Sequence, residues 1–301
     1  MAWVWALVSL LAVACAPAPS ALQPLSPPVV VPPPAPAWFV SARAHAGSTS
    51  TLALEVALSV AAPDNALAPR CSSTHALPVC SGPGRAQPAR RVMLVGSSTM
   101  GGAIGVPLAR ALEALDVDVS NLGQASTSLA RGDIMHWPTR LREDMGSFLP
   151  DLVIAQIGGN DCQPIIGPDN DVRARRSDLE HWHREYGVVL MELVQSIRQG
   201  GAGIVLLDLQ PARRDEYNQC VTGINEVTRQ VASTFGIPLL SVYDLTDSDE
   251  QTFAEEIPVD GQLTDIRTDD GYHLNMFGGR YVARQLLRFL IDSDLVRTWE
   301  P

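Results

Sequence analysis

Two adjacent serines, Ser97 and Ser98, follow a short apolar run at residues 92–95. The run is typical of a strand buried on both faces, and the turn that begins at Gly96 leads into a predicted helix at 103–115. A serine in such a turn places its hydroxyl at the carboxyl edge of the sheet, near unpaired N–H groups of the incoming helix. That position suits a nucleophile and the binding of an anion. It equally suits a plain serine-rich turn or helix cap, so the choice depends on residues further along the chain.

Two later predicted strands end in groups that could stabilise a negative charge on oxygen. Gly123 follows the strand predicted at 117–119, and a glycine there lets the backbone and its N–H approach a ligand closely. Asn160 follows two glycines after the strand predicted at 152–157. Its side-chain amide is an uncharged donor that could face a developing oxyanion, although both positions also fit ordinary turns.

Near the end of the chain, Asp270 and His273 are three residues apart and precede the last predicted helix. At this spacing the carboxylate can hold the imidazole in one tautomer and stabilise its charged form. Asp265 and Asp269 are alternative partners for His273, but the spacing favours Asp270. A nucleophile, an oriented histidine and the donors of Ser98, Gly123 and Asn160 together form the set that acyl transfer requires.

Short apolar runs alternate with helix-like segments from about residue 90 onward, which predicts a parallel sheet covered on both faces. The expected fold is a three-layer α/β/α sandwich with five parallel strands, and ligands are expected at the carboxyl ends of these strands. The predicted strands are 92–95, 117–119, 152–157, 204–209 and 239–242, and the predicted helices are 103–115, 178–198, 225–235 and 277–291.

The four blocks that contain Ser98, Gly123, Asn160 and His273, in this order, resemble the SGNH or GDSL hydrolase superfamily. The resemblance covers about residues 90–291. It implies the flavodoxin-like SGNH fold, with Ser98 as nucleophile, Gly123 and Asn160 as oxyanion donors beside the Ser98 N–H, His273 as base and Asp270 as its partner. It also implies a reaction without a metal or organic cofactor.

One residue departs from the family pattern, in which the nucleophile follows Gly-Asp: Ser97 stands in the place of the aspartate. The spacing from Gly96 favours Ser98 over Ser97 as the nucleophile, and the remaining blocks are intact. The stretch 126–141, with its Arg131-Gly132-Asp133 and His136-Trp137-Pro138, is similar to a bacterial branch of exported proteins whose substrates are largely unassigned.

The resemblance implies an exported serine esterase that hydrolyses carboxylic esters through an acyl-serine intermediate. Its substrate would be a small acyl ester, a lipid ester or an O-acetylated glycan. The alternatives are an O-acyltransferase acting on cell-envelope sugars and a non-catalytic envelope protein that binds glycans. Arg213 and Arg214, after the fourth predicted strand, could contact an acidic substrate or lie in a solvated loop.

The chain has 301 residues and a formal net charge of −11, which argues against binding to a nucleic-acid backbone. Its first 14 residues are apolar and have the length of a signal-peptide hydrophobic region, although no basic residue precedes Arg43. Leu11-Ala12-Val13-Ala14-Cys15 resembles the bacterial lipoprotein box, in which the cysteine is lipidated. We therefore expect a membrane-anchored lipoprotein of the cell envelope, with ordinary cleavage near residues 16–21 and a periplasmic or secreted protein as the alternative.

Four cysteines remain after Cys15, and an even number in an exported chain favours two disulfides. Four cysteines allow three pairings. Cys71 and Cys80 would close a small loop, while Cys162 and Cys220 would each follow a strand at the same sheet edge and could meet there. Free buried thiols are the alternative.

Three regions are expected along the chain. Residues 1–21 form the signal peptide, residues 22–88 form a Pro/Ala-rich linker and a poorly defined segment, and residues 89–301 form the catalytic domain. The proline-rich part, up to residue 37, cannot build a core and predicts an extended spacer. The apolar run at 51–60 is compatible with either a strand or a helix.

Overall fold

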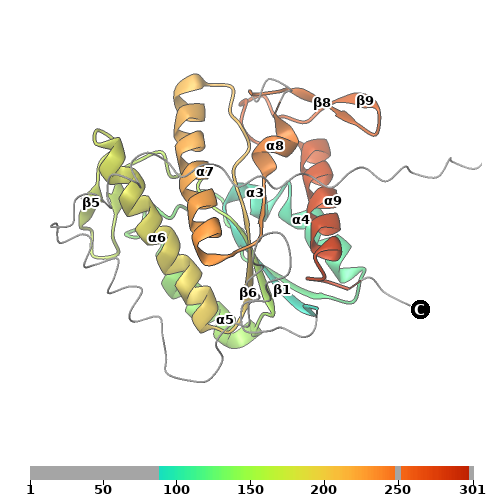
Figure 1. Ribbon diagram of the computed structural model, residues 1–301, viewed down its shortest axis with the longest axis horizontal. Helices are drawn as coiled ribbons and strands as arrows, with labels where there is room; N and C mark the ends of the chain where they lie inside the picture. Colours follow the sequence, from blue (N-terminus) through green and yellow to red (C-terminus); the bar gives the residue numbers. More distant parts are fainter. Residues whose placement is uncertain (1–87, 248–251, 298–301) are drawn as a thin grey trace, which may run out of the picture. The chain divides into compact units, whose positions relative to one another are not determined.

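A five-stranded parallel sheet forms the centre of the computed structural model, which describes residues 88–247 and 252–297 (Figure 1). The strand order is β2-β1-β3-β6-β7, so the chain starts in the sheet, moves one strand outward and then returns across β1 to build the other half. All pairings are parallel, as the sequence predicts. The strands are β1 (Arg91–Gly96), β2 (Asp118–Asn121), β3 (Leu152–Gln156), β6 (Gly203–Leu207) and β7 (Leu239–Leu240).

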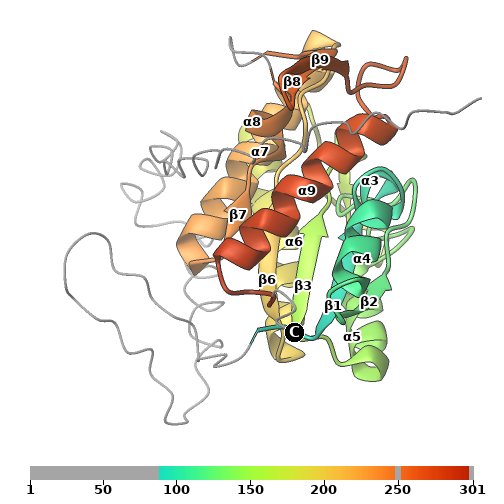
Figure 2. The ribbon, with the colours of Figure 1, turned by 90° about the vertical axis from the view of Figure 1, so that its right-hand side faces the viewer.

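Helices cover both faces of this sheet, which confirms the predicted three-layer α/β/α architecture (Figures 1 and 2). In β1, Met93 and Val95 point into the layer with α5, α6 and α7, whereas Val92 and Leu94 point into the layer with α4 and α9. Both sets are fully buried, because successive side chains of a strand point to opposite faces. The helices are α4 (Gly105–Glu113), α5 (Trp137–Phe148), α6 (Leu179–Gln199), α7 (Asp215–Phe235) and α9 (Met276–Asp292).

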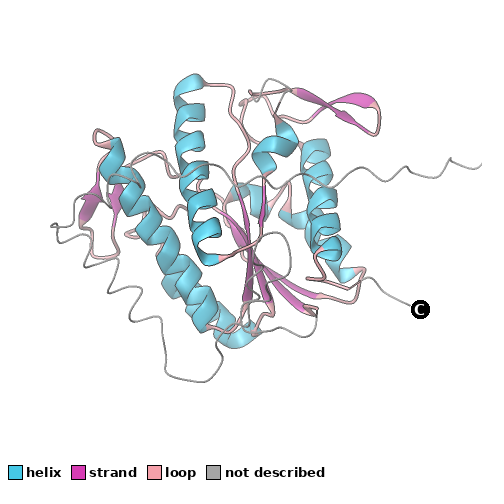
Figure 3. Cartoon of the chain, viewed as in Figure 1, coloured by secondary structure: helices cyan, strands magenta, loops and turns pink. Residues whose placement is uncertain are grey.

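Several elements differ from those that the sequence predicts (Figure 3). Helix α7 begins ten residues earlier than predicted, although Tyr217, Cys220, Val221 and Ile224 in its first part stand at helical spacing. Helix α5 is amphipathic but largely polar, and it was not predicted. The last strand ends at Leu240, because Ser241 caps a short helix, α8 (Val242–Thr246), by accepting a hydrogen bond from the Asp244 N–H.

Two antiparallel hairpins lie outside the central sheet and were also not predicted. The first joins β4 (Ile165–Ile166) and β5 (Val172–Ala174), and the second joins β8 (Glu256–Val259) and β9 (Gln262–Asp265). Asp260 and Gly261 connect β8 and β9 with φ angles of 51° and 82°. Positive φ at both central residues is the conformation for which an Asp-Gly pair is preferred in two-residue hairpin turns.

The N-terminal predictions lie outside the described residues. They comprise the signal peptide at 1–21, lipidation at Cys15, nearly all of the linker segment 22–88 and the Cys71–Cys80 disulfide. Within the described ranges, no helix is both long enough and apolar enough to span a membrane.

Candidate active site

The structure brings the three residues predicted for proton transfer into one hydrogen-bonded chain. Ser98 Oγ lies 2.8 Å from His273 Nε2, across 175 residues of sequence, and His273 Nδ1 lies 2.6 Å from Asp270 Oδ2. With the Nδ1 proton donated to the carboxylate, Nε2 is free to accept the proton of the Ser98 hydroxyl. This is the geometry of a serine nucleophile with a general base.

The two adjacent serines have different environments. Ser98 is the first residue of α3 (Ser98–Gly101) and faces His273, whereas Ser97 precedes the helix and is only 5% exposed. As the first helical residue, Ser98 has a backbone N–H without an intrahelical partner, so this N–H is available at the same point as the hydroxyl. The structure thus places Ser98, and not Ser97, in contact with His273.

Four hydrogen bonds fix the Asp270 carboxylate. Oδ2 accepts from His273, while Oδ1 accepts from the Thr268 hydroxyl at 2.7 Å and from the backbone N–H groups of Tyr272 and His273 at 2.9 and 3.0 Å. Partial burial raises the pKa of this carboxyl, but the hydrogen bonds, led by that from the His273 side chain, lower it well below its usual value. Asp270 therefore stays ionised and keeps His273 oriented.

The turn that carries Asp270 and His273 is anchored by a buried guanidinium. Arg267 is 5% exposed and donates to the backbone carbonyls of Ala254, Thr246 and Tyr272. Burial lowers its pKa to about 10, so it remains charged at neutral pH. Asn275 then caps α9 by accepting hydrogen bonds from the N–H groups at its second and third positions, which fixes the other end of the turn.

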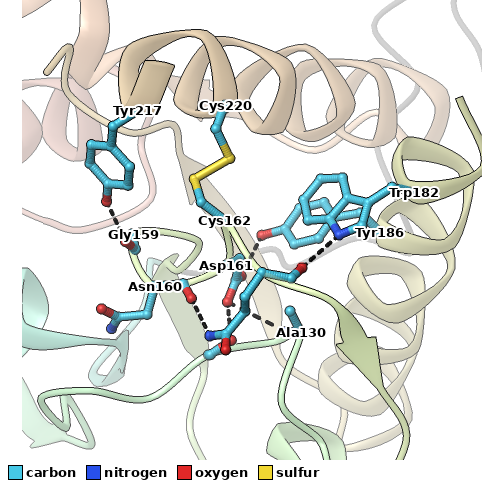
Figure 4. Close-up of a disulfide and its surroundings, with 11 residues drawn as sticks. Ala130, Gly159, Asn160, Asp161, Cys162, Trp182, Tyr186, Tyr217 and Cys220 are labelled. Atoms are coloured by element: carbon cyan, nitrogen blue, oxygen red, sulfur yellow. Dashed lines mark hydrogen bonds between the residues drawn. A yellow bond between two sulfur atoms is a disulfide. The ribbon is translucent and has the colours of Figure 1, made fainter. Parts of the chain in front are cut away.

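Asn160 lies on the loop after β3, beside the nucleophile. One hydrogen of its side-chain amide is donated to the Thr127 carbonyl at 2.9 Å, which leaves the second for a ligand. The next residue, Asp161, is fully buried and accepts from the Ser128 hydroxyl, from the Tyr186 hydroxyl at 2.8 Å and from the Ala130 N–H at 3.4 Å (Figure 4). Burial raises the pKa of Asp161, and this buried network holds the loop in place.

Gly123 packs against the backbone of α3, but its N–H group already has a hydrogen-bond acceptor. Its N–H donates to Asn121 Oδ1 at 2.8 Å, and the Asn121 amide donates in turn to the Met100 carbonyl at 2.9 Å. To stabilise an oxyanion, the Gly123 N–H must share this hydrogen with Asn121 or leave it. A Cβ at Gly123 would stand 2.2 Å from the Gly101 nitrogen, so the glycine is needed for the close approach of this loop to α3.

A disulfide and a tyrosine join the Asn160 loop to α7. Cys162 and Cys220 form the predicted disulfide, with Cα atoms 6.0 Å apart, and the Tyr217 hydroxyl donates to the Gly159 carbonyl (Figure 4). Burial raises the pKa of Tyr217 to about 12. The first two turns of α7 are therefore fixed relative to Asn160.

Ser98, His273, Asp270 and Asn160 line a cavity of about 210 Å³. It lies where the sequence predicts a ligand, at the carboxyl ends of the strands. Across the described ranges, no group of three or more His, Cys, Asp or Glu side chains is placed to hold a metal ion. The cavity is lined by Ser98, Gly159, Asn160, Arg214, Tyr217, Asp270, Tyr272 and His273.

The sequence predictions do not single out three of the residues around the site. Tyr217 stands at helical spacing with Cys220, Val221 and Ile224, a pattern that could have extended the predicted helix, and the sequence does not distinguish Arg214 from Arg213. Asn121 is not among the predicted site residues. Its position two residues before Gly123 is one from which an Asn side chain often accepts a backbone N–H, as it does here from Gly123. Gly123 itself does not line the cavity.

Comparison with known proteins agrees with this architecture. The family model described as "Protein of unknown function (DUF459)" matches residues 91–288. A "putative acylhydrolase" from Bacteroides fragilis superposes with a TM-score of 0.50 at 17% identity, over 69% of this chain and 91% of that protein. A "GDSL-like lipase" from Bacteroides thetaiotaomicron has a TM-score of 0.49 at 16% identity, over 68% and 89% of the two chains. No curated protein matches the sequence. The chain therefore belongs to the DUF459 family and has the fold of the SGNH and GDSL hydrolases.

Proposed function

We propose that this protein is a serine esterase that hydrolyses carboxylic esters through an acyl-serine intermediate. The observation that carries the proposal is the continuous chain from Ser98 Oγ through His273 to the Asp270 carboxylate, at 2.8 and 2.6 Å. A serine that only caps a helix or binds a glycan has no need of an oriented imidazole. Ser98, His273 and Asp270 all line the cavity, so an ester carbonyl has access to the Ser98 hydroxyl.

The first half of the reaction forms the acyl-enzyme. Ser98 Oγ attacks the ester carbonyl carbon while His273 Nε2 takes its proton, and Asp270 stabilises the imidazolium. The carbonyl oxygen becomes an oxyanion that the Ser98 N–H and the free hydrogen of the Asn160 amide can stabilise. The bond from the carbonyl carbon to the ester oxygen then breaks, and the alcohol leaves with the proton from His273.

The second half releases the acid. A water molecule attacks the acyl carbon while His273 takes one of its protons, and the bond to Ser98 Oγ breaks as His273 returns that proton to the serine. The cavity of about 210 Å³ is smaller than the 300–1,000 Å³ typical of drug-sized ligand sites. Its size supports a short acyl group, such as the acetyl of an O-acetylated glycan.

We also propose that the protein works outside the cytoplasm, anchored by a lipid at Cys15. The Cys162–Cys220 disulfide supports an oxidising compartment, since structural disulfides are rare in the cytosol. Expression of the full chain should place the protein in the membrane fraction, and Cys15→Ser should release it from that fraction. If Cys15→Ser fractionates with the membrane as the wild type does, the lipid anchor at Cys15 is refuted.

Hydrolysis of p-nitrophenyl acetate tests the esterase proposal. Wild type and Ser97→Ala should turn over, whereas Ser98→Ala should lose activity, and a fluorophosphonate should label wild type but not Ser98→Ala. Ser97→Ala is the matched control, because it removes the same hydroxyl from the adjacent residue. Turnover by Ser98→Ala would move the nucleophile elsewhere, and a wild type that is neither active nor labelled would refute the proposal.

A further inference from the structure

Arg214 is the only lining residue of the active-site cavity with a free positive charge. Its side chain is exposed, and among the described residues no ion pair, hydrogen bond or ring contact engages its guanidinium. The acidic lining residue, Asp270, is committed to His273 and its own turn. The cavity therefore has an arginine fork without a protein counter-charge beside Ser98.

The adjacent arginine, Arg213, differs from Arg214 because its guanidinium has protein partners. Arg213 forms an ion pair with Glu255, donates to the Asp269 carbonyl at 3.2 Å and lies 5.4 Å from the Phe253 ring centroid. Arg213 thus supports the turn that carries Asp270. Within the described ranges the Arg214 side chain performs no such structural task, although it lines the cavity.

The base of the Arg214 side chain is held firmly relative to the oxyanion donor. Arg214 immediately precedes α7, and its carbonyl accepts from the Asn218 N–H at 2.8 Å. One turn further, Tyr217 is bonded to Gly159, and Cys220 is bonded to Cys162, on either side of Asn160. The guanidinium therefore moves only through its own rotamers, and a substrate whose ester lies at Ser98 can be bound by Arg214 at the same time.

On the basis of the proposed esterase function, we propose that Arg214 selects substrates that carry an anionic group near the ester. The planar guanidinium matches carboxylate and phosphate geometry through two parallel hydrogen bonds. The anion can belong to the acyl group, as in a dicarboxylic half-ester, or to the alcohol. Both sources present the same chemistry to Arg214. Asp215 and Glu216, which follow it, are exposed and do not line the cavity.

Two pairs of esters that differ in one charge distinguish these sources. On the acyl side, p-nitrophenyl hemisuccinate is compared with p-nitrophenyl butyrate, and on the alcohol side p-acetoxybenzoate is compared with its methyl ester. The quantity measured is the ratio of kcat/KM within each pair, for wild type, Arg214→Gln, Arg214→Lys and Arg110→Gln. This ratio does not depend on the fraction of active enzyme. Arg110 is the control, because it is an exposed arginine on α4 that does not line the cavity.

In at least one pair, Arg214→Gln should lower the preference for the anion about fivefold, which equals about 1 kcal/mol, the upper range for an exposed ion pair. Arg214→Lys should retain part of it, and Arg110→Gln should retain all of it. Equal ratios in wild type and Arg214→Gln for both pairs would overturn the inference and leave the esterase function standing.

If the wild-type protein cleaves none of the four esters, the inference is tested by the rate of fluorophosphonate labelling instead. An uncharged fluorophosphonate labels an activated Ser98, and monomethyl succinate should slow this labelling more than methyl butyrate does. Arg214→Gln should remove the difference. If the difference persists in that variant, or is absent from wild type, the inference fails. If wild type is not labelled at all, the esterase proposal fails first.

Discussion

Replacement of Gly123 by alanine tests how closely the nucleophile depends on the loop after β2. The new Cβ would stand 2.2 Å from the Gly101 nitrogen, 2.4 Å from the Met100 carbonyl carbon and 2.6 Å from the Gly101 Cα. All three are backbone atoms of the short helix that begins with Ser98. They cannot swing aside as a side chain would, so the loop or α3 must shift.

The size of that shift sets the expected loss. Carbon atoms pack at about 3.5–4.0 Å, so the variant must open the contact by about 1 Å or more. A misplacement of that size can reduce activity about 100-fold, because the 2.8 Å contact between Ser98 Oγ and His273 Nε2 has little tolerance. Overpacking should also lower the free energy of unfolding by about 1–3 kcal/mol.

The assay is kcat/KM for p-nitrophenyl acetate, measured beside urea denaturation of the same samples. Gly146→Ala is the matched control: it lies in α5 with open space around the new Cβ, and alanine there should raise the free energy of unfolding by about 0.5–1 kcal/mol and leave activity unchanged. The alanine variant of Gly123 keeps its backbone N–H, so any loss reports the steric contact and not the removal of a donor. Full activity in folded Gly123→Ala would refute this account of the loop.

Three other variants test separate parts of the structure. Asp270→Asn removes the charge that orients His273, and kcat should fall by about 100-fold or more without loss of fold by circular dichroism; an active variant would show that the carboxylate is dispensable. Cys162→Ser/Cys220→Ser opens a loop of 58 residues and should cost about 4 kcal/mol in urea denaturation, whereas an unchanged midpoint would show that the loop needs no crosslink. Because burial raises the pKa of Asp161, the folded chain holds that proton to a higher pH than the unfolded chain, so its contribution to the free energy of unfolding should decrease as the pH rises above about 4. Asp161→Asn should flatten that part of the stability curve, and an unchanged slope would contradict the assignment.

Strands β1, β3 and β6 at the centre of the sheet could be predicted because they are short apolar runs buried on both faces, so composition alone marks them. The order of the blocks along the chain also indicated which residues meet, since the carboxyl ends of parallel strands share one edge. The start of α7 was predicted ten residues too late, although Tyr217, Cys220, Val221 and Ile224 stand at helical spacing; what the sequence does not show is that this part is fixed by long-range contacts such as that of Tyr217 with Gly159. No local pattern reports such contacts.

The difference between Arg213 and Arg214 shows the same limit at the site. In the sequence they are equivalent neighbours, but the partner that engages Arg213 is Glu255, 42 residues away. The commitment of the Gly123 N–H to Asn121 is local, yet a sequence cannot show which of several acceptors a turn will use. Charge and hydrogen-bond occupancy at the cavity therefore depend on the folded chain.

The separation of 175 positions between Ser98 and His273 in the sequence has a consequence for biosynthesis. All five strands of the central sheet, the nucleophile and Asn160 precede residue 241, whereas Asp270 and His273 come later, immediately before α9. A nascent chain thus has Ser98 before it has the His273 with which that serine forms its hydrogen bond. Under the proposed esterase function, reactivity toward esters would arise only once the last helix packs against α4, and an unfinished chain would be inert.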